Sequence, residues 1–124
     1  MSLPVLYSLL ETLNVRDIIN RQCPTQAEVD HGTVALVLIL NRLMFPLPLY
    51  QIADWVAQTV LVAVLDMPAA KFNDDRLERT LDALYPHLEV IWLEVVTIAM
   101  QKADIDLSVI FYDLTAFVAH GRYA

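Results

Sequence analysis

Residues 28–44 read EVDHGTVALVLILNRLM, and this stretch decides the fold. Every residue from Val34 to Leu40 is apolar, and the apolar positions lie nearly all round a helix rather than along one stripe. We therefore expect a helix that begins between Glu28 and Thr33, continues to the end of the stretch and lies buried at the centre of the molecule. The run is far shorter than the roughly 20 apolar residues that cross a bilayer, which favours a core helix over a membrane anchor.

Apolar residues at helical spacing on both sides of this stretch predict further helices. They cover residues 2–13, 16–21, 49–60, 74–84 and 86–102, and an extension of the third of these to residue 65 is left open. Prolines stand at most of the breaks, where a missing N–H donor and a restricted backbone end a helix. The tryptophans, Trp55 and Trp92, are expected in the core rather than at a ligand site. In the last helix, the residues expected to face inward are Leu88, Ile91, Trp92, Val95 and Ile98.

The composition changes at Asp104 to Asp106, where helical spacing ends. Residues 107–117, LSVIFYDLTAF, form a nearly continuous apolar, β-branched and aromatic run, which is typical of a strand buried on both faces. The expected fold is therefore mainly α: a compact bundle of about five to six helices in residues 1–104, followed by a C-terminal β-strand or hairpin in residues 105–124. Because an isolated hairpin is marginally stable, we expect it to pack on the helices or to form a homodimer through Leu107 to Phe117.

Charge and cysteine content narrow the class of protein. Eight Lys and Arg face fifteen Asp and Glu, for a formal net charge of −7, whereas DNA-binding domains usually carry a basic surplus. Any DNA binding is therefore expected to be weak, and the candidate residues are Arg76 and Arg79, three apart on one side of a predicted helix. The single cysteine forms no disulfide within the chain, and the N-terminus lacks the basic segment of a signal peptide, so we expect a cytoplasmic protein without a membrane partner.

The usual metal and nucleotide motifs are missing from the sequence. The three histidines and the cysteine are scattered without the spacing of zinc ligands, and two glycines in the whole chain leave little material for a phosphate-binding loop. Asn73, Asp74 and Asp75 could be considered as metal ligands, but helix capping explains three short polar residues before an apolar-periodic run. We therefore expect neither a cofactor nor a metal.

Asp113 stands out because it lies in the middle of the apolar 107–117 segment. An ionised carboxylate without partners is costly to bury, so the residue needs an explanation. It could lie at the end of the strand and hydrogen-bond with Thr115, or it could project from a central strand and bind a divalent cation with other carboxylates. Spacing alone does not decide between the two.

Four segments, taken in order, resemble the opening part of certain bacterial and archaeal insertion-sequence transposases of the DDE class. They are residues 28–44, PLYQIADWVAQTVL at 48–61, FNDDRLERTLDALYPHL at 72–88 and FYDLTAF at 111–117. In those proteins a helical N-terminal domain of unknown function precedes an RNase H-like catalytic domain. The resemblance implies that Leu107 to Asp113 corresponds to the first strand of the catalytic core, and that Asp113 corresponds to the first carboxylate of the DDE triad.

DDE chemistry requires several carboxylates that converge on two divalent metal ions, and only the first is present here. We therefore expect a non-catalytic chain with a vestigial Asp113, which binds no metal; Mg²⁺ would be expected only in a full-length transposase. The chain ends 11 residues after Asp113, without the second strand of the family, which suggests a truncated or decayed gene product or a standalone derivative. The expected function is DNA-end recognition, subunit assembly or both, and the alternative is a self-associating interaction module that does not bind DNA.

Overall fold

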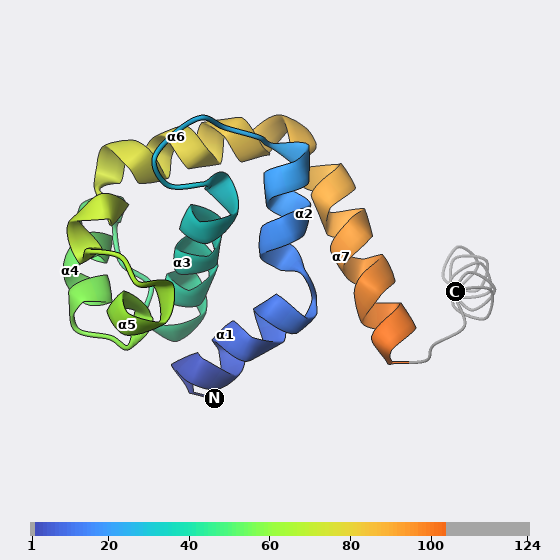
Figure 1. The fold of residues 1–124 in the computed structure, drawn as a ribbon, viewed down its shortest axis with the longest axis horizontal. Coiled ribbons are helices and arrows are strands. Elements are labelled where there is room, and N and C mark those ends of the chain that lie inside the picture. Colours follow the sequence, from blue (N-terminus) through green and yellow to red (C-terminus); the bar gives the residue numbers. More distant parts are fainter. Residues whose placement is uncertain (1, 104–124) are drawn as a thin grey trace, which may run out of the picture.

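The computed structural model describes residues 2–103, and this part of the chain is almost entirely helical (Figure 1). The sequence-based prediction of a mainly α fold is confirmed, and no strand occurs among residues 2–103. The predicted strand or hairpin in residues 105–124 lies outside the described residues. The α-helices are α1 (Leu3–Thr12), α2 (Val15–Gln22), α3 (His31–Met44), α4 (Leu49–Ala57), the short α5 (Leu61–Leu65), α6 (Asp74–Leu84) and α7 (Leu88–Lys102), and the 3₁₀-helices are η1 (Ala69–Phe72) and η2 (Tyr85–His87).

Helix α3 is the central element, as its sequence predicts. It begins where the Asp30 carboxylate accepts a hydrogen bond of 2.7 Å from the Thr33 N–H, which satisfies one of the free donors of the first turn. Helices α1, α2 and α6 all pack against it. Val34, Leu36 and Leu40 are fully buried as a result, because neighbours cover this helix on several sides.

Asn41 organises the corner at which α3 gives way to α4. Its side chain is buried, donates to the Phe45 carbonyl at 3.1 Å and accepts from the Leu47 N–H at 3.1 Å. These are backbone groups that the prolines at 46 and 48 prevent from joining a helix. The Asn41 amide thus satisfies one backbone acceptor and one backbone donor of the corner. Helices α3 and α4 meet there at 90°.

The stripe predicted as a single helix from residue 49 to residue 60 or 65 is broken. Helix α4 ends at Ala57, and the Thr59 hydroxyl donates to the Val56 carbonyl at 2.9 Å and accepts from the Leu61 N–H at 3.2 Å. The hydroxyl therefore takes the place of helical backbone partners, and the chain forms a turn before α5 begins. Threonine side chains often compete with helix hydrogen bonds in this way. As a consequence Val60 is exposed instead of continuing the apolar stripe.

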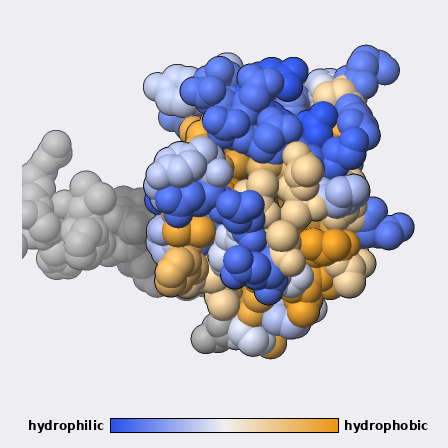
Figure 2. Space-filling model, turned by 90° about the vertical axis from the view of Figure 1, so that its left-hand side faces the viewer, coloured by the Kyte–Doolittle hydropathy of each residue, from blue (hydrophilic) through white to orange (hydrophobic). Residues whose placement is uncertain are grey.

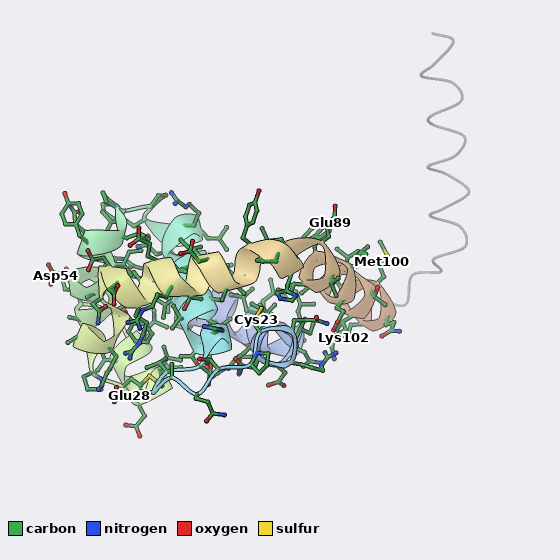
Figure 3. The ribbon with its side chains drawn as sticks, turned by 90° about the horizontal axis from the view of Figure 1, so that it is seen from above. Cys23, Glu28, Asp54, Glu89, Met100 and Lys102 are labelled. Carbon is green, nitrogen blue, oxygen red and sulfur yellow. The ribbon has the colours of Figure 1, made fainter. Side chains whose placement is uncertain are left out.

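Helices α6 and α7 form the outer edge of the molecule. Asn73 caps α6 by accepting from the Arg76 N–H at 2.9 Å, in agreement with the capping expected of residues 73–75. The expected break between the helices of residues 74–84 and 86–102 is also present, because η2, which contains Pro86, separates α6 from α7. Helix α6 crosses the ends of α2 and α3, and α7 then runs back beside α2 (Figure 1). Seen from above, α7 leads away from the bundle, with Met100 and Lys102 near its end (Figure 3).

Two clusters of apolar residues result from this arrangement. The first, which we call the closed core, lies between α3, α4, α5, η1 and α6, and its fully buried members are Val34, Val37, Leu40, Ile52, Val56, Leu61, Phe72 and Leu77. The second joins α2, α3, α6 and α7, and it includes Ile18, Ile19, Leu36, Leu84 and Ile91. The second cluster is open on one side.

Candidate functional site

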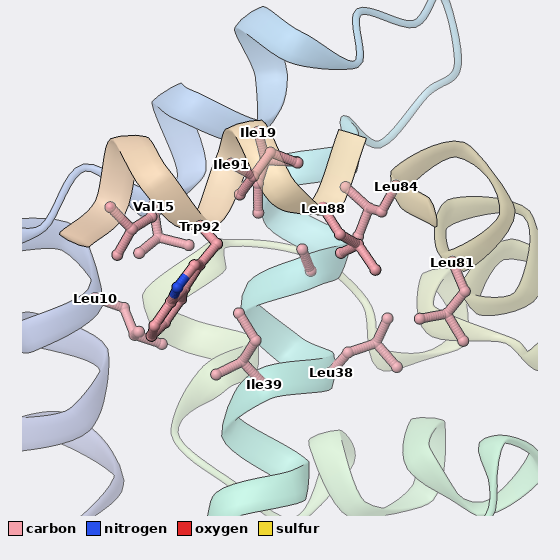
Figure 4. A pocket seen from close by; sticks show the side chains of 12 residues that line it. Leu10, Val15, Ile19, Leu38, Ile39, Leu81, Leu84, Leu88, Ile91 and Trp92 are labelled. Atoms are coloured by element: carbon pink, nitrogen blue, oxygen red, sulfur yellow. The ribbon is translucent and has the colours of Figure 1, made fainter. Parts of the chain in front are cut away.

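The open side of the second cluster is an apolar groove of about 420 Å³ (Figure 4). This volume lies within the roughly 300–1,000 Å³ that is usual for ligand pockets. Five helices contribute to its walls, and α7 supplies the largest share. The lining residues are Leu10 from α1, Val15 and Ile19 from α2, Ala35, Leu38 and Ile39 from α3, Leu81 and Leu84 from α6, and Leu88, Ile91, Trp92 and Val95 from α7.

The groove has no charged group in its lining, and the Trp92 indole N–H is its only polar side-chain atom. Such a surface has nothing with which to bind a metal or a phosphate or to transfer a proton. It is suited to hold apolar groups. Binding them would remove the apolar surface of both the groove and the bound groups from water, which is favourable. The groove is therefore a site for packing rather than for catalysis.

Helix α7 forms one wall of the groove and is held in place mainly by α2. It packs on α2, where Glu94 accepts hydrogen bonds from Arg21 at 2.7 Å and from Gln22 at 2.6 Å. These bonds fix the orientation of α7 about its own axis. Glu94 thus links α7 to α2.

The expected inward stripe of α7 is only partly correct. Ile91 is buried, but Leu88 is 50% exposed and Trp92 is 66% exposed. The prediction that Trp92 is a core residue is therefore wrong for the described residues, because residues 2–103 leave most of its side chain uncovered. Trp55, by contrast, is partly buried and packs against the closed core.

A second apolar stripe runs along the other side of α7. Val90 and Leu93 are 45% and 64% exposed, and Thr97 follows one turn later. The Thr97 hydroxyl donates to the Leu93 carbonyl at 2.7 Å, so this polar group is satisfied within the helix. We call these three residues the outer stripe. A helix that is apolar nearly all round is normally buried on all sides. The apolar sequence of α7 therefore already indicates that its exposed faces are suited to contact a further element.

Other exposed apolar side chains lie around α4 and α5, including Val60 and Val64. On this side of the molecule the hydrophobic surface is interrupted by hydrophilic residues, which gather over much of the face (Figure 2). Scattered exposed apolar residues are ordinary on a folded protein. The groove and the outer stripe are therefore the stronger candidates for an interaction surface.

The two arginines predicted as DNA contacts lie beside one small pocket of about 120 Å³, which His31 and Thr25 also line. Both arginines are engaged within the chain. Arg76 donates to the Lys71 carbonyl at 2.9 Å, and its side chain is only 17% exposed. Arg79 is 67% exposed and pairs with Asp75 at 2.6 Å.

Glu28 reduces the positive charge near these arginines. Its carboxylate bonds to Lys71 and lies 3.7 Å from the Arg76 guanidinium, and these two cations hold the pKa of Glu28 below its usual value. Helix α6 itself carries four acidic residues and two basic ones. The arginine pocket is therefore small and partly neutralised.

Titratable groups elsewhere have structural partners. Burial raises the pKa of the Asp30 carboxyl, but hydrogen bonds from Thr33 and Asn20 and the charge of Arg16 outweigh burial and leave the pKa below its usual value. Burial raises the pKa of the Cys23 thiol, which donates to the Ala83 carbonyl at 3.5 Å. Within residues 2–103, no three acidic, histidine or cysteine side chains are grouped as metal ligands.

Asp113 lies outside the described residues, as does the homodimer contact predicted through Leu107 to Phe117. Both stay predictions. Among the described residues, the helical stretch Asp74–Lys102 is long and apolar enough to cross a membrane by composition, a test that core helices of soluble proteins also pass. The bonds from Glu94 to α2 show that α7 is instead packed on the bundle in this structure.

Comparison with known proteins gives one match. Residues 2–96 match the family described as "Domain of unknown function (DUF4277)". The match ends within α7, so it covers nearly the whole helical unit. No curated protein and no protein of solved structure matches the sequence.

Proposed function

The chain belongs to the DUF4277 family of domains of unknown function, and on that premise we propose that it forms a non-catalytic N-terminal domain of a DDE transposase that serves subunit assembly. The observation that carries the proposal is the outer stripe of α7, an exposed apolar surface on a helix already held in place by α2. Apolar stripes of this kind are what packed helices present to one another. The transposase part of the proposal rests on the four resembling segments.

The assembly test is light scattering on the intact 124-residue chain over a range of concentrations. We expect association, because a second copy can cover Val90 and Leu93, and we expect Val90→Glu combined with Leu93→Glu to abolish it. A matched control is Val60→Glu combined with Val64→Glu, which places the same charges on two exposed valines near α5. A wild-type chain that stays monomeric at every concentration would contradict assembly.

The transposase part is tested separately. It predicts that the genomic sequence beyond codon 124 encodes, in frame or after a frameshift, the second aspartate and the glutamate of a DDE triad. Their absence, together with clear self-association, would favour the alternative of a standalone interaction module.

DNA-end recognition is a second candidate, supported by the common pocket of Arg76, Arg79 and His31. Phosphate contacts from arginine are strongly salt-dependent, so binding should be sought at low salt with a labelled duplex. We expect Arg76→Ala combined with Arg79→Ala to weaken binding, and Arg42→Ala combined with Lys102→Ala, two exposed cations elsewhere, to serve as the control of equal charge. No binding of the wild-type chain at any salt concentration would remove this candidate. We rank it below assembly because Glu28 and Asp75 already pair with the two arginines.

A further inference from the structure

We infer that the groove is the binding site of the chain's own 107–117 segment, which follows α7 directly in the sequence. This inference goes beyond the proposed function and does not rest on it, since it follows from the chemistry of the groove and the length of chain available to reach it. The homodimer predicted through the same segment is the competing arrangement.

The chemistry of the segment matches that of the groove. Eight of the eleven residues in LSVIFYDLTAF are apolar, and three of these are aromatic. The groove offers apolar side chains from five helices and no charged partner. Its volume of about 420 Å³ holds several such side chains.

The chain is long enough to reach the groove. Helix α7 continues past Val95, the last of its residues in the groove, to Lys102, so the chain leaves α7 roughly 10 Å from that end of the groove at 1.5 Å per residue. Residues 104–108, when extended, span up to about 17 Å at 3.3 Å per residue. The apolar residues from position 109 onward can therefore return along α7 to Trp92 and Leu88.

The covalent link favours this occupant over a separate molecule. A segment tethered by a few residues has an effective concentration in the millimolar range, so even a weak apolar contact is populated. Binding in the groove requires that Asp113 keep its contact with water, because the lining has no partner for a buried carboxylate.

Trp92 reports on the occupant, since it lines the groove and is one of two tryptophans in the chain. In a Trp55→Phe background, we expect acrylamide to quench Trp92 weakly in the full chain, independently of protein concentration. Ile110→Asp, Phe111→Asp and Leu114→Asp combined should raise the quenching constant several-fold and shift the emission to the red. The control adds the same three charges outside the segment, through Ala119→Asp, Gly121→Asp and Ala124→Asp, and should leave both values unchanged.

A second pair of variants tests the groove side of the contact. Leu88 and Leu93 are both exposed leucines on α7, but only Leu88 lines the groove. We expect Leu88→Glu, and not Leu93→Glu, to increase the access of acrylamide to Trp92. Far-ultraviolet circular dichroism checks that each variant keeps its helices.

Four results would overturn the inference. Trp92 could be fully accessible in the wild-type chain, or it could stay shielded in the triple variant. Shielding that rises with protein concentration would identify a second copy as the occupant. Shielding that is present only with phosphatidylcholine–phosphatidylserine vesicles would identify a lipid surface.

Discussion

The closed core and the groove are built from the same kinds of side chain, yet one is sealed and the other open. Phe72 in the closed core is 0% exposed, whereas Trp92 in the groove is 66% exposed. The difference lies in how the elements around each site are arranged. Phe72 is enclosed by α4 and α6 as well as its own turn, while the groove is lined by five helices but is open on one side. Apolar composition thus shows which residues gain from burial, but only the arrangement of the elements decides which of them are covered.

The largest expected effect is in the closed core. Phe72→Ala removes a fully buried aromatic ring and leaves a cavity that its neighbours cannot fill, so we expect a loss of about 3–5 kcal/mol in the free energy of unfolding. Urea denaturation followed by circular dichroism measures it. A loss below about 1 kcal/mol would mean that the closed core is not sealed, and the contrast with the groove would disappear.

Gly32→Ala tests the joint between α2 and α3, which supports one wall of the groove. A Cβ atom at this position would lie 2.4 Å from the Arg16 carbonyl oxygen and 2.7 Å from the Asn20 side-chain oxygen. The backbone would have to move apart, and we expect a loss of about 1–3 kcal/mol. Gly32→Ser should cost as much or more, since it adds the same Cβ. An unchanged free energy of unfolding would show that α2 moves freely against α3.

Asp30→Ala removes the N-cap of α3, and we expect it to cost about 0.5–2 kcal/mol at neutral pH. Because the pKa of Asp30 is lowered in the folded state, its contribution is fully present above the unfolded pKa of about 3.9 and is lost as the pH falls through the folded value. The difference between wild type and variant should therefore shrink below about pH 4.

Asp30→Asn is the control for this cap. The amide oxygen can still accept from Thr33, so the loss at neutral pH should be smaller than for Asp30→Ala. This smaller loss should also shrink below about pH 4, because Asp30 of the wild type is protonated there and the amide does not titrate. Equal losses for both variants at all pH values would assign the effect to charge rather than to the cap.

The smallest effect is expected from a matched pair of Ile→Val changes. Ile52 is buried in the closed core, and Ile52→Val should cost about 0.5–1.5 kcal/mol. Ile39 lines the groove, where the lost methylene leaves no new enclosed cavity, so Ile39→Val should cost less than Ile52→Val. A reversed order would show that the groove wall is packed as tightly as the closed core.

Much of the helical scaffold could be predicted from local sequence. The extent of α3, the Asn73 cap and the break at Pro86 depend on residues within a few positions of one another, where periodicity and capping rules apply. The division between α4 and α5 could not, because the Thr59 hydroxyl interrupts an apolar stripe that continues across it.

The candidate site was less predictable because it depends on contacts between distant residues. The exposure of Trp92 follows from what lies opposite α7, and the partial neutralisation of Arg76 follows from Glu28 on a separate loop. Neither the exposure of Trp92 nor the pairing of Arg76 with Glu28 can be inferred from the spacing of neighbouring residues. The surplus of apolar positions on α7 is the one sequence feature that indicates an exposed apolar face, but a fully buried helix has the same surplus.

The environment of Cys23 has a practical consequence for probing the groove. Thiol-directed reagents attack the thiolate, and a buried thiol whose pKa is raised offers very little of it at neutral pH. A cysteine introduced at position 88 or 93 should therefore take up a maleimide spin label or fluorophore selectively, while the native thiol stays unmodified. The native cysteine therefore does not have to be removed before labelled α7 is used for distance measurements to the element that covers the groove.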